Sequence, residues 1–368
     1  MKTSTTPSIP LNSRSHLSEK TSTFLQPDDH DFQSYLLKGV SRTFALTIPT
    51  LPDSLRYVVT NAYLLCRAVD TIEDEPTIHP AQKRILCEEF VQVVAGASSA
   101  SKLSGKLSPL LSPHTIPAEH ELIAHLERVI CITHQFSVSQ RNALERCVRI
   151  MAEGMAFFQD HNSARGLATL ADMDRYCYYV AGVVGEMLTD LFCDYSPAMA
   201  KNHQEMMILA VSFGQGLQMT NILKDIWEDQ TRDTCWLPRD VFAQQGFNLD
   251  DLGLKPRPRS FEKGLEYLLG VAHAHLKNAF RYTLYIPPQE KGIREFCLWA
   301  LGMAVLTLHR INRNRDFSRG EQVKISRKSV KATIITTHLT VSNNFLLRLL
   351  FNASRWGLPI SKLNGFPN

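Results

Sequence analysis

The stretch YLLCRAVDTIEDE, residues 63–75, carries three acids on one helix face and is echoed by NILKDIWED, residues 221–229. Acids at the first, fourth and fifth positions of DxxED share a face because each helical residue turns by about 100°. Alone, this pattern is typical of a solvated helix. Apolar neighbours such as Leu64, Leu65, Ile226 and Trp227 bury both helices, so we expect the acids to line an internal cleft. The first ridge is Asp70, Glu73 and Asp74, and the second ridge is Asp225, Glu228 and Asp229.

The two ridges predict a binding site for divalent cations. Carboxylates stacked at i,i+3 and i,i+4 repel one another, and a bound cation removes that repulsion. Asn221 precedes Asp225 by one turn and adds a neutral oxygen on the same face. Magnesium combines one or two carboxylates with water and phosphate oxygens, whereas zinc prefers the His and Cys ligands that the ridges lack. We expect Mg²⁺, or Mn²⁺ in its place, on Asp70, Glu73, Asp74, Asn221, Asp225 and Asp229.

Composition indicates an ordinary globular chain. Hydrophobic residues make up 44% of the 368 residues and charged residues 21%. The net charge of +4 is too small to indicate a nucleic-acid partner, although it suits an anionic substrate or an anionic membrane surface. The eight cysteines form no CxxC pair and lie mostly in apolar helical patterns, which indicates reduced core thiols and a cytoplasmic location.

The chain divides into three expected regions. Residues 1–27 are rich in Ser and Thr, lack the apolar run of a signal peptide and are expected to be disordered. Residues 28–355 are expected to form one helical domain, because no linker separates the two ridges, and residues 356–368 form a C-terminal tail. No apolar run reaches the roughly 20 residues that span a bilayer, so any membrane contact is expected to be peripheral.

Helical periodicity predicts an all-α fold. Apolar residues recur at i, i+3, i+4 and i+7 in long segments, and period-2 alternation is nearly absent. A Ser-, Pro- and Gly-rich link is expected over residues 97–117. The two ridges indicate helices arranged around a central apolar channel. The expected helices are 31–38, 53–75, 80–96, 118–131, 137–160, 170–194, 200–230, 259–285, 288–311 and 326–352.

The tetrapeptide SRTF, residues 41–44, is a candidate for phosphate recognition. Ser41 and Arg42 carry groups that hold phosphate oxygens, and Phe44 suits the wall of an apolar tube. The same four residues also fit an ordinary helix-entry turn. Tyr63 and Arg67 extend the face of the first ridge, and Arg67 is either an ion-pair partner of its acids or a grip for a diphosphate.

The segment YCYYVAGVVGEML, residues 176–188, places two glycines inside an apolar helix. Each glycine costs about 1 kcal/mol relative to alanine, so its presence needs a reason. Close helix packing is one explanation, and room for a long apolar ligand beside Gly185 is the other. Tyr176, Val180 and Val183 recur at i, i+4 and i+7, which puts a phenol at the end of an apolar wall. Tyr176 is therefore a candidate for orienting or relaying a proton.

The segment VKISRK, residues 323–328, follows several arginines. A solvated cationic face explains it on composition alone. The sharper interpretation is a flap that holds the phosphates of a nucleotide cofactor or docks on anionic lipid.

Together these segments resemble the squalene/phytoene synthase family of head-to-head prenyl transferases. The resemblance covers about residues 30–335 and implies the isoprenoid synthase fold, with magnesium-bridged diphosphates and two prenyl chains in a central channel. Gln218 and Lys224, beside Asn221, are expected to face the substrate. The matching elements are SRTF (41–44), YLLCRAVDTIEDE (63–75), YCYYVAGVVGEML (176–188) and NILKDIWED (221–229).

Two segments resemble the squalene synthases within this family. VKISRK resembles the segment on their NADPH side, which implies that Lys324, Arg327 and Lys328 bind the cofactor, with Arg232 nearby. The segment around Phe296 resembles one that carries a functional aromatic.

Four features depart from the family pattern. Lys224 stands where the family commonly has Arg and lacks its bidentate fork. Arg232 lies about two residues before the family's usual Arg, and Ala300-Leu301 replaces a Pro-Gln pair. The sequence has no segment like the membrane-spanning tail of animal-type squalene synthases, from which we expect a soluble, bacterial-type enzyme.

The resemblance implies Mg²⁺-dependent condensation of two farnesyl diphosphates through presqualene diphosphate, then reduction by NADPH to squalene. Metals on the Asp residues of both ridges would stabilise departing pyrophosphate. Tyr176 would handle a proton or stabilise a cation, and Phe44 and Phe296 would exclude water. The alternatives are a dehydrosqualene or phytoene synthase that ends by proton loss without NADPH, and a catalytically silent assembly partner. Prenyl chain length, oligomeric state and the environment of residues 345–351 stay open.

Overall fold

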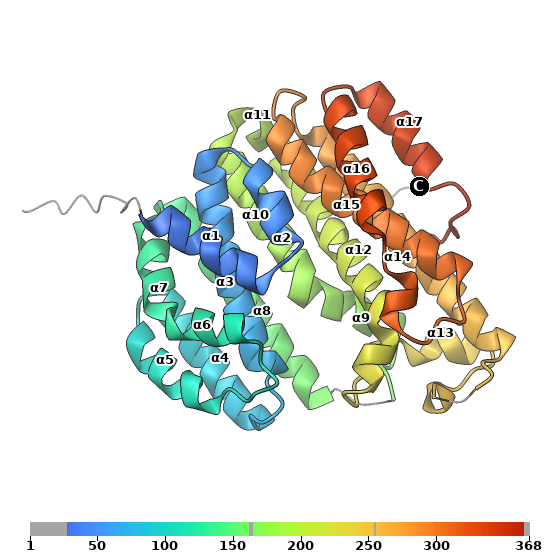
Figure 1. Cartoon of the computed structure of the whole chain (residues 1–368), viewed down its shortest axis with the longest axis horizontal. Helices are drawn as coiled ribbons and strands as arrows, with labels where there is room; N and C mark the ends of the chain where they lie inside the picture. Colours follow the sequence, from blue (N-terminus) through green and yellow to red (C-terminus); the bar gives the residue numbers. More distant parts are fainter. Residues whose placement is uncertain (1–27, 162–164, 254, 364–368) are drawn as a thin grey trace, which may run out of the picture.

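The computed structural model describes residues 28–161, 165–253 and 255–363, and these residues confirm the predicted all-α fold (Figure 1). The described residues contain no β-strand, and one isolated bridge joins Leu167 to Pro238. The α-helices are α1 (Asp28–Val40), α2 (Phe44–Thr47), α3 (Asp53–Asp74), α4 (Pro80–Val94), α5 (Ala100–Leu107), α6 (Pro117–Ala124), α7 (Leu126–Gln135), α8 (Val138–His161), α9 (Leu170–Cys177), α10 (Val183–Tyr195), α11 (Pro197–Ala200), α12 (His203–Gln230), α13 (Arg239–Gln244), α14 (Arg259–Tyr285), α15 (Lys291–Arg313), α16 (Arg327–Thr340) and α17 (Asn344–Ser354). Shorter elements are the 3₁₀ turns η1 (Ile48–Thr50), η2 (Ser108–Leu110), η4 (Leu249–Asp251) and η5 (Gly320–Val323), and the π-helix η3 (Tyr178–Gly182).

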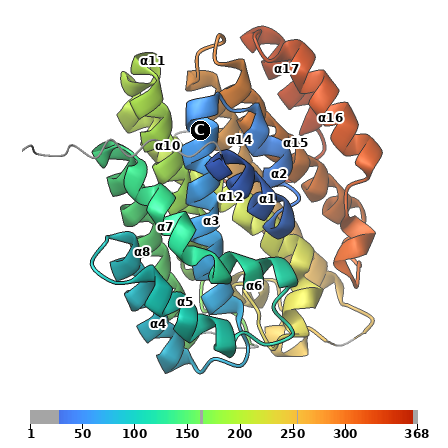
Figure 2. The same ribbon diagram turned by 60° about the vertical axis from the view of Figure 1, so that its left-hand side comes forward.

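Helix α12 runs through the middle of the molecule and carries the second ridge (Figures 1 and 2). It packs against α10, α14, α15 and the π-helix η3, and it buries apolar residues such as Phe213, Leu223 and Ile226. By length and composition, α12 is the one helix in the described ranges that meets the criteria for crossing a membrane. Because 56% of its most apolar 18-residue stretch is buried inside the protein, α12 has the environment of a core helix.

Helix α3 carries the first ridge and packs against α1, α8 and α10. Its apolar residues include Leu64, Leu65 and Ile72, which are fully buried. Helix α10 contacts α3, α8 and α12, so it joins the half of the chain that contains α3 to the half that contains α12 (Figure 2). One contiguous apolar core links the two ridge-bearing helices and fixes their separation.

The expected link over residues 97–117 contains structure that the sequence analysis missed. Helix α5 begins after Ser99, whose hydroxyl accepts a hydrogen bond from the Lys102 amide at 3.3 Å. Leu103 and Leu107, one turn apart, are fully buried. With Ala100, the helix has only three apolar residues, which are too few to reveal a helical period, so the sequence alone predicts a link there.

Three expected helices are interrupted. Residues 118–131 divide at His125 into α6 and α7, and residues 170–194 contain the π-helix η3 between α9 and α10. Residues 326–352 divide at a turn over 341–343, where the Asn343 side chain accepts hydrogen bonds from the amides of Phe345 and Leu346. This N-cap starts α17 in a new direction.

The expected disordered segment 1–27 lies outside the described residues. The expected tail is described as far as Leu363 and lies along α14, where Leu358 is buried. The His273 ring Nδ1 lies 2.7 Å from the Pro359 carbonyl oxygen.

Candidate active site

Both ridges occupy the last turns of their helices, α3 and α12. The C-terminal end of a helix carries partial negative charge, which adds to the repulsion among the acids. Glu75 fixes the end of α3, because its buried carboxylate accepts hydrogen bonds from the Ser112 amide at 2.9 Å and the Thr115 hydroxyl at 2.6 Å. Burial opposes ionisation of Glu75, but these hydrogen bonds outweigh it and lower its pKa to about 2. The repelling acids of the first ridge are therefore held on a fixed helix end.

The carboxylates of the two ridges act on one another. The pKa of Asp70 is raised to about 7 by burial and by the charge of Asp74. The pKa of Asp229 is raised to about 7 by burial and by Asp225, with a further contribution from Asp74 of the first ridge. Burial also raises the pKa of Asp225. Because the charge of Asp74 raises the pKa of Asp229, the two ridges share one electrostatic environment. Bound cations would reduce the repulsion among the carboxylates of both ridges.

Tyr176 on α9 is influenced by the charges of both ridges. Its phenol is buried, and burial together with the charges of Glu73, Asp74 and Asp229 raises its pKa well above the ordinary value. The phenol therefore stays protonated at neutral pH and is available as a hydrogen-bond donor.

Two aromatic rings that the sequence analysis missed surround Tyr176. The Trp236 ring stacks on the Tyr176 ring with centroids 3.7 Å apart, and the Phe158 ring meets Tyr176 edge-on at 5.3 Å. Phe158 is on α8 and Trp236 is in the loop before α13. No local pattern marks either residue, because only tertiary packing brings them together.

Three cationic residues adjoin the ridges. Lys83 on α4, which the sequence analysis missed, donates from Nζ to the Glu73 carbonyl oxygen, and burial lowers its pKa against the opposing charges of Glu73 and Asp74. The Lys224 Nζ lies 3.0 Å from Asp225 Oδ2. Arg232, exposed just beyond α12, lowers the pKa of Asp225 and of Asp229 through its charge.

Arg67 adopts the ion-pair arrangement that the sequence left open. Its Nε donates to Glu119 Oε1 at 2.9 Å, and its Nη1 lies 3.7 Å from Asp70 Oδ2. Glu119, buried on α6, has no motif around it and was missed. The binding of a diphosphate by Arg67 stays a prediction.

The SRTF segment forms the turn that enters α2 and packs onto α3. The Phe44 amide donates to Ser41 Oγ at 3.0 Å, and the Phe44 ring contacts the Tyr63 ring with centroids 4.8 Å apart. The Tyr63 hydroxyl donates to the Val40 carbonyl at 3.4 Å. Arg42 is exposed. The structure thus brings Ser41, Phe44 and Tyr63 together, one turn of α3 before Arg67.

The segment 176–188 packs closely against α12 at Gly185, which leaves no room for a ligand at that point. A Cβ added to Gly185 would lie 2.4 Å from the Ala210 carbonyl oxygen on α12, so close helix packing explains this glycine. Val183 is fully buried and Val180 is half-buried. The π-helix η3 breaks the expected i, i+4, i+7 face, because a wider turn shifts every later side chain around the axis.

Phe296 on α15 is buried in the interface with α10. Its ring meets Phe192 edge-on, with centroids 6.2 Å apart. A role for Phe296 beside a reacting cation stays a prediction.

The second ridge is hydrogen-bonded to the turn η5, which immediately precedes most of the basic segment. Glu228 Oε1 accepts a hydrogen bond from the Gly320 amide at 2.8 Å, and a Cβ added at Gly320 would lie 2.9 Å from that oxygen. The turn η5 then leads to Lys324, Arg327 and Lys328, which are exposed.

The α12 residues ahead of the second ridge occupy different environments. Gln218 is half-buried, and Asn221 is exposed one turn before Asp225.

The donor set fits magnesium held jointly by protein and ligand. Within the described ranges, no three His, Cys, Asp or Glu side chains converge as a ready-made metal cluster. The ridges instead supply separated carboxylates, and burial together with neighbouring charges raises the pKa of Asp70, Asp225 and Asp229. Magnesium needs only one or two protein carboxylates and completes its shell with phosphate and water oxygens.

A family model described as squalene/phytoene synthase matches residues 37–329. The squalene synthase of Schizosaccharomyces pombe is 29% identical over 84% of this chain and 65% of the relative. The squalene synthase of Eremothecium gossypii is 31% identical over 74% of this chain and 60% of the relative. The chain therefore spans somewhat under two thirds of the length of these curated relatives.

Solved structures share the fold. A complex of TcSQS with the ligand BPH1237 superposes with a TM-score of 0.71 at 22% identity, over 93% of this chain and 94% of that one. A dehydrosqualene synthase with a ligand superposes with a TM-score of 0.61 at 18% identity, over 89% of this chain and 97% of that one.

Proposed function

This chain belongs to the squalene/phytoene synthase family, and on that premise we propose that it is a squalene synthase, which condenses two farnesyl diphosphates head to head and reduces the product with NADPH. One observation carries the proposal: α3 and α12 share one apolar core and each ends in an acidic ridge, and the charges of both ridges act on the buried phenol of Tyr176. Similarity to curated squalene synthases supports this choice of product.

The ridges would hold Mg²⁺, or Mn²⁺ in its place, through Asp70, Asp74, Asp225 and Asp229, with Glu73 and Asn221 alongside. Bound metal supplies Lewis-acid stabilisation of the departing pyrophosphate. The cations Arg67, Lys83 and Lys224 offset further negative charge around the ridges. Ser41 and Arg42 would contact diphosphate oxygens, and Gln218 would lie along the substrate.

The aromatic cluster suits an allylic cation. The π-faces of Tyr176, Trp236 and Phe158 attract positive charge and exclude water that would otherwise trap the cation as an alcohol. The protonated Tyr176 phenol would orient the leaving pyrophosphate or pass on the proton lost when the cyclopropane of presqualene diphosphate closes. Phe44, Tyr63, Val180 and Phe296 would wall the prenyl chains.

The reductive step would involve the basic segment. Lys324, Arg327 and Lys328 lie at the N-terminus of α16, where the helix dipole favours phosphate groups. NADPH supplies the hydride that quenches the final cation. The Glu228–Gly320 hydrogen bond would hold this segment against the second ridge, with Arg232 on the same side. We further propose a cytoplasmic location with peripheral membrane contact.

Product analysis tests the proposal. The purified chain is incubated with farnesyl diphosphate and Mg²⁺, with and without NADPH, and the hydrocarbons are identified by mass. Squalene that forms only with NADPH supports the proposal. Dehydrosqualene regardless of NADPH, or preferred use of geranylgeranyl diphosphate, would assign the chain to the proton-loss branch instead. No Mg²⁺-dependent turnover with either substrate would indicate a catalytically silent assembly partner.

A further inference from the structure

Exposed apolar side chains gather at the C-terminal end of the described chain. Sixteen large apolar side chains are exposed among the described residues, and seven of them fall within residues 335–360. The most exposed is Trp356 at 88%, and the others lie on α16, α17 and the loop that follows. These seven residues, here called the apolar rim, are Ile335, Leu339, Phe345, Leu346, Leu349, Trp356 and Ile360.

Helix α17 is apolar on two opposite faces. Leu347 and Phe351 face the core, where the Phe351 ring stacks on Phe280 of α14 with centroids 4.3 Å apart. Phe345 and Leu349 lie one turn apart on the other side and are 68% and 52% exposed. A solvent-facing helix normally turns polar residues outward. The outer face of α17 therefore has the apolar composition of a surface that contacts another apolar surface.

The hairpin formed by α16 and α17 is fastened to the core, so its exposure does not come from a detached segment. The buried Arg294 donates from Nη1 to the Val341 carbonyl in the hairpin turn at 2.8 Å. His338 Nδ1 lies 2.6 Å from Glu295 Oε1. Figures 1 and 2 show α16 and α17 side by side at an outer edge of the molecule. The part of the apolar rim that lies on α16 and α17 is therefore a fixed feature of this edge.

The chain segment that forms the hairpin and the tail after it carries charge of one sign. After Glu321 the chain contains no Asp or Glu, against seven Lys and Arg. Lys331 of α16 shares a face with Ile335, one turn away, and Arg348 of α17 lies next to Leu349; both cations are exposed. Apolar side chains bordered by cations are the pattern of surfaces that sit in the headgroup region of an anionic bilayer.

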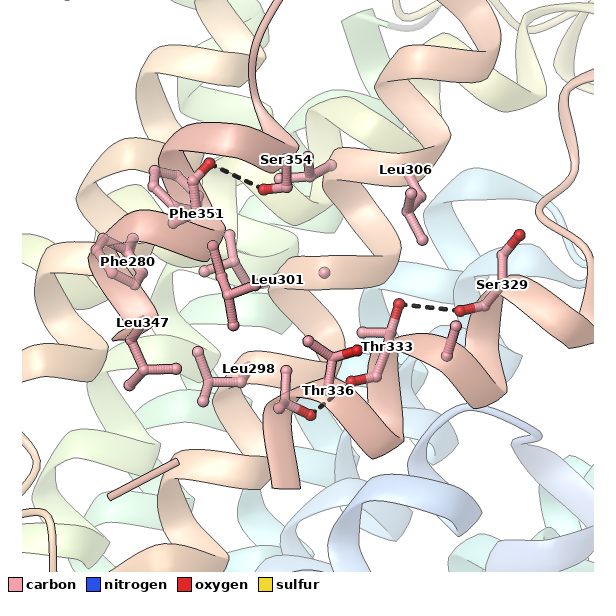
Figure 3. A pocket seen from close by; sticks show the side chains of 15 residues that line it. Phe280, Leu298, Leu301, Leu306, Ser329, Thr333, Thr336, Leu347, Phe351 and Ser354 are labelled. Atoms are coloured by element: carbon pink, nitrogen blue, oxygen red, sulfur yellow. Dashed lines mark hydrogen bonds between the residues drawn. The ribbon is translucent and has the colours of Figure 1, made fainter. Parts of the chain in front are cut away.

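Behind the hairpin, the inner faces of α16 and α17 do not close completely on α15. An apolar groove of about 350 Å³ lies between the three helices and is lined by residues such as Leu298, Leu301, Leu347 and Phe351 (Figure 3). The hairpin therefore offers apolar surface on its inner side as well as on its rim, which suits a lipid partner better than a polar one.

We propose that the apolar rim and the adjacent Lys331 and Arg348 form a docking surface for an anionic lipid bilayer. The apolar side chains enter the interface and the cations meet lipid headgroups. Two copies of the chain meeting through this face would bring together two regions with the same positive charge, which opposes self-association. The inference rests on the surface alone and holds whichever product the active site makes.

Tryptophan fluorescence tests the proposal on the unaltered chain. Of the four tryptophans, Trp227, Trp236 and Trp299 are at most 9% exposed, so Trp356 is the one that can change environment at the surface. We expect vesicles of phosphatidylcholine and phosphatidylglycerol to shift the emission to the blue, and brominated lipid to quench the shifted component. A Trp356→Phe variant should lose the quenching. Unchanged emission with anionic vesicles would overturn the proposal.

Sedimentation with the same vesicles separates the apolar and charged contributions. Each cation near an anionic surface contributes about fivefold in binding, so Lys331→Gln/Arg348→Gln should bind about 25-fold more weakly. Leu349→Ser/Trp356→Ser should lose at least about tenfold. The matched controls are Lys102→Gln/Lys263→Gln and Ile85→Ser/Val138→Ser, which remove exposed residues elsewhere. Both controls should bind like the unaltered chain.

Several results would overturn the assignment. Equal binding of the rim variants and the control variants would exclude the rim, and equal binding to pure phosphatidylcholine would exclude the role of charge. Light scattering in the absence of lipid gives a further check: a dimer that Leu349→Ser/Trp356→Ser dissociates would make the rim a contact between copies. The substituted side chains are largely exposed, so thermal melts should show that each variant folds.

Discussion

Neutralising Asp70 is expected to stabilise the metal-free protein while it removes activity. Burial and Asp74 raise the pKa of Asp70 from 3.8 to about 7. Well below pH 3.8 the carboxyl is protonated in both the folded and the unfolded state, so it contributes no difference. As the pH rises, the unfolded chain releases its proton first and stability falls, until the folded state also ionises near pH 7. Asp70→Asn escapes this loss, so its advantage grows from pH 4 to about pH 7 and then stays constant.

The size of the effect follows from the pKa of Asp70. A rise from 3.8 to about 7 corresponds to about 4 kcal/mol. The Asp70 side chain is 32% exposed, and solvent screens much of this interaction, so we expect Asp70→Asn to raise the free energy of unfolding by about 1–2 kcal/mol at pH 8. At pH 5 the gain should be less than half as large, because the folded carboxyl there is still protonated.

Urea unfolding with a metal chelator at pH 5 and pH 8 measures this difference. Asp31→Asn, which neutralises an exposed acid on α1, is the matched control and should change stability by no more than about 0.5 kcal/mol. Adding Mg²⁺ and pyrophosphate should stabilise the unaltered protein more than Asp70→Asn, because the variant has lost a ligand. An Asp70→Asn variant that is less stable than the unaltered protein at pH 8 would refute the reasoning.

Three other outcomes are expected. Asp70→Asn and Asp225→Asn should each abolish pyrophosphate release from farnesyl diphosphate, measured by coupled phosphate detection, and normal release by both would refute the metal assignment. Gly185→Ala should destabilise the fold by about 2–3 kcal/mol in thermal or urea unfolding, because its Cβ meets the Ala210 carbonyl, whereas Gly105→Ala, which faces open space on α5, should stabilise it slightly. Glu75→Gln should cost about 2 kcal/mol at pH 7, and in the unaltered protein this contribution should disappear as the pH falls from 4.5 towards 2, whereas equal urea midpoints at pH 7 would contradict the role of Glu75.

The long helices and the two ridges were predictable because their patterns repeat over many turns. Helix α12 runs for 28 residues with an acidic motif at its end, and α3 for 22. Short elements gave no comparable signal, as α5 shows. The π-helix η3 was also unpredictable, because the wider turn depends on how Tyr178–Gly182 packs against α12 and α8.

The site was predictable only where its residues stand inside motifs. Tyr176 and the ridge acids were found this way. The sequence did not indicate Lys83, Glu119 and Trp236, because each lies in a segment without a motif. Only tertiary packing brings them into contact with Glu73, Arg67 and Tyr176, respectively. For Gly185 the sequence allowed two explanations, and the contact with Ala210 shows which one applies in the folded chain.

The most direct measurement follows deuterium from the reductant to the product. The chain is incubated with farnesyl diphosphate, Mg²⁺ and NADPH that carries deuterium at the transferred position, and the hydrocarbon is analysed by mass spectrometry. We predict squalene that contains one deuterium. Unlabelled dehydrosqualene as the main product would contradict the proposal that the last cation receives a hydride.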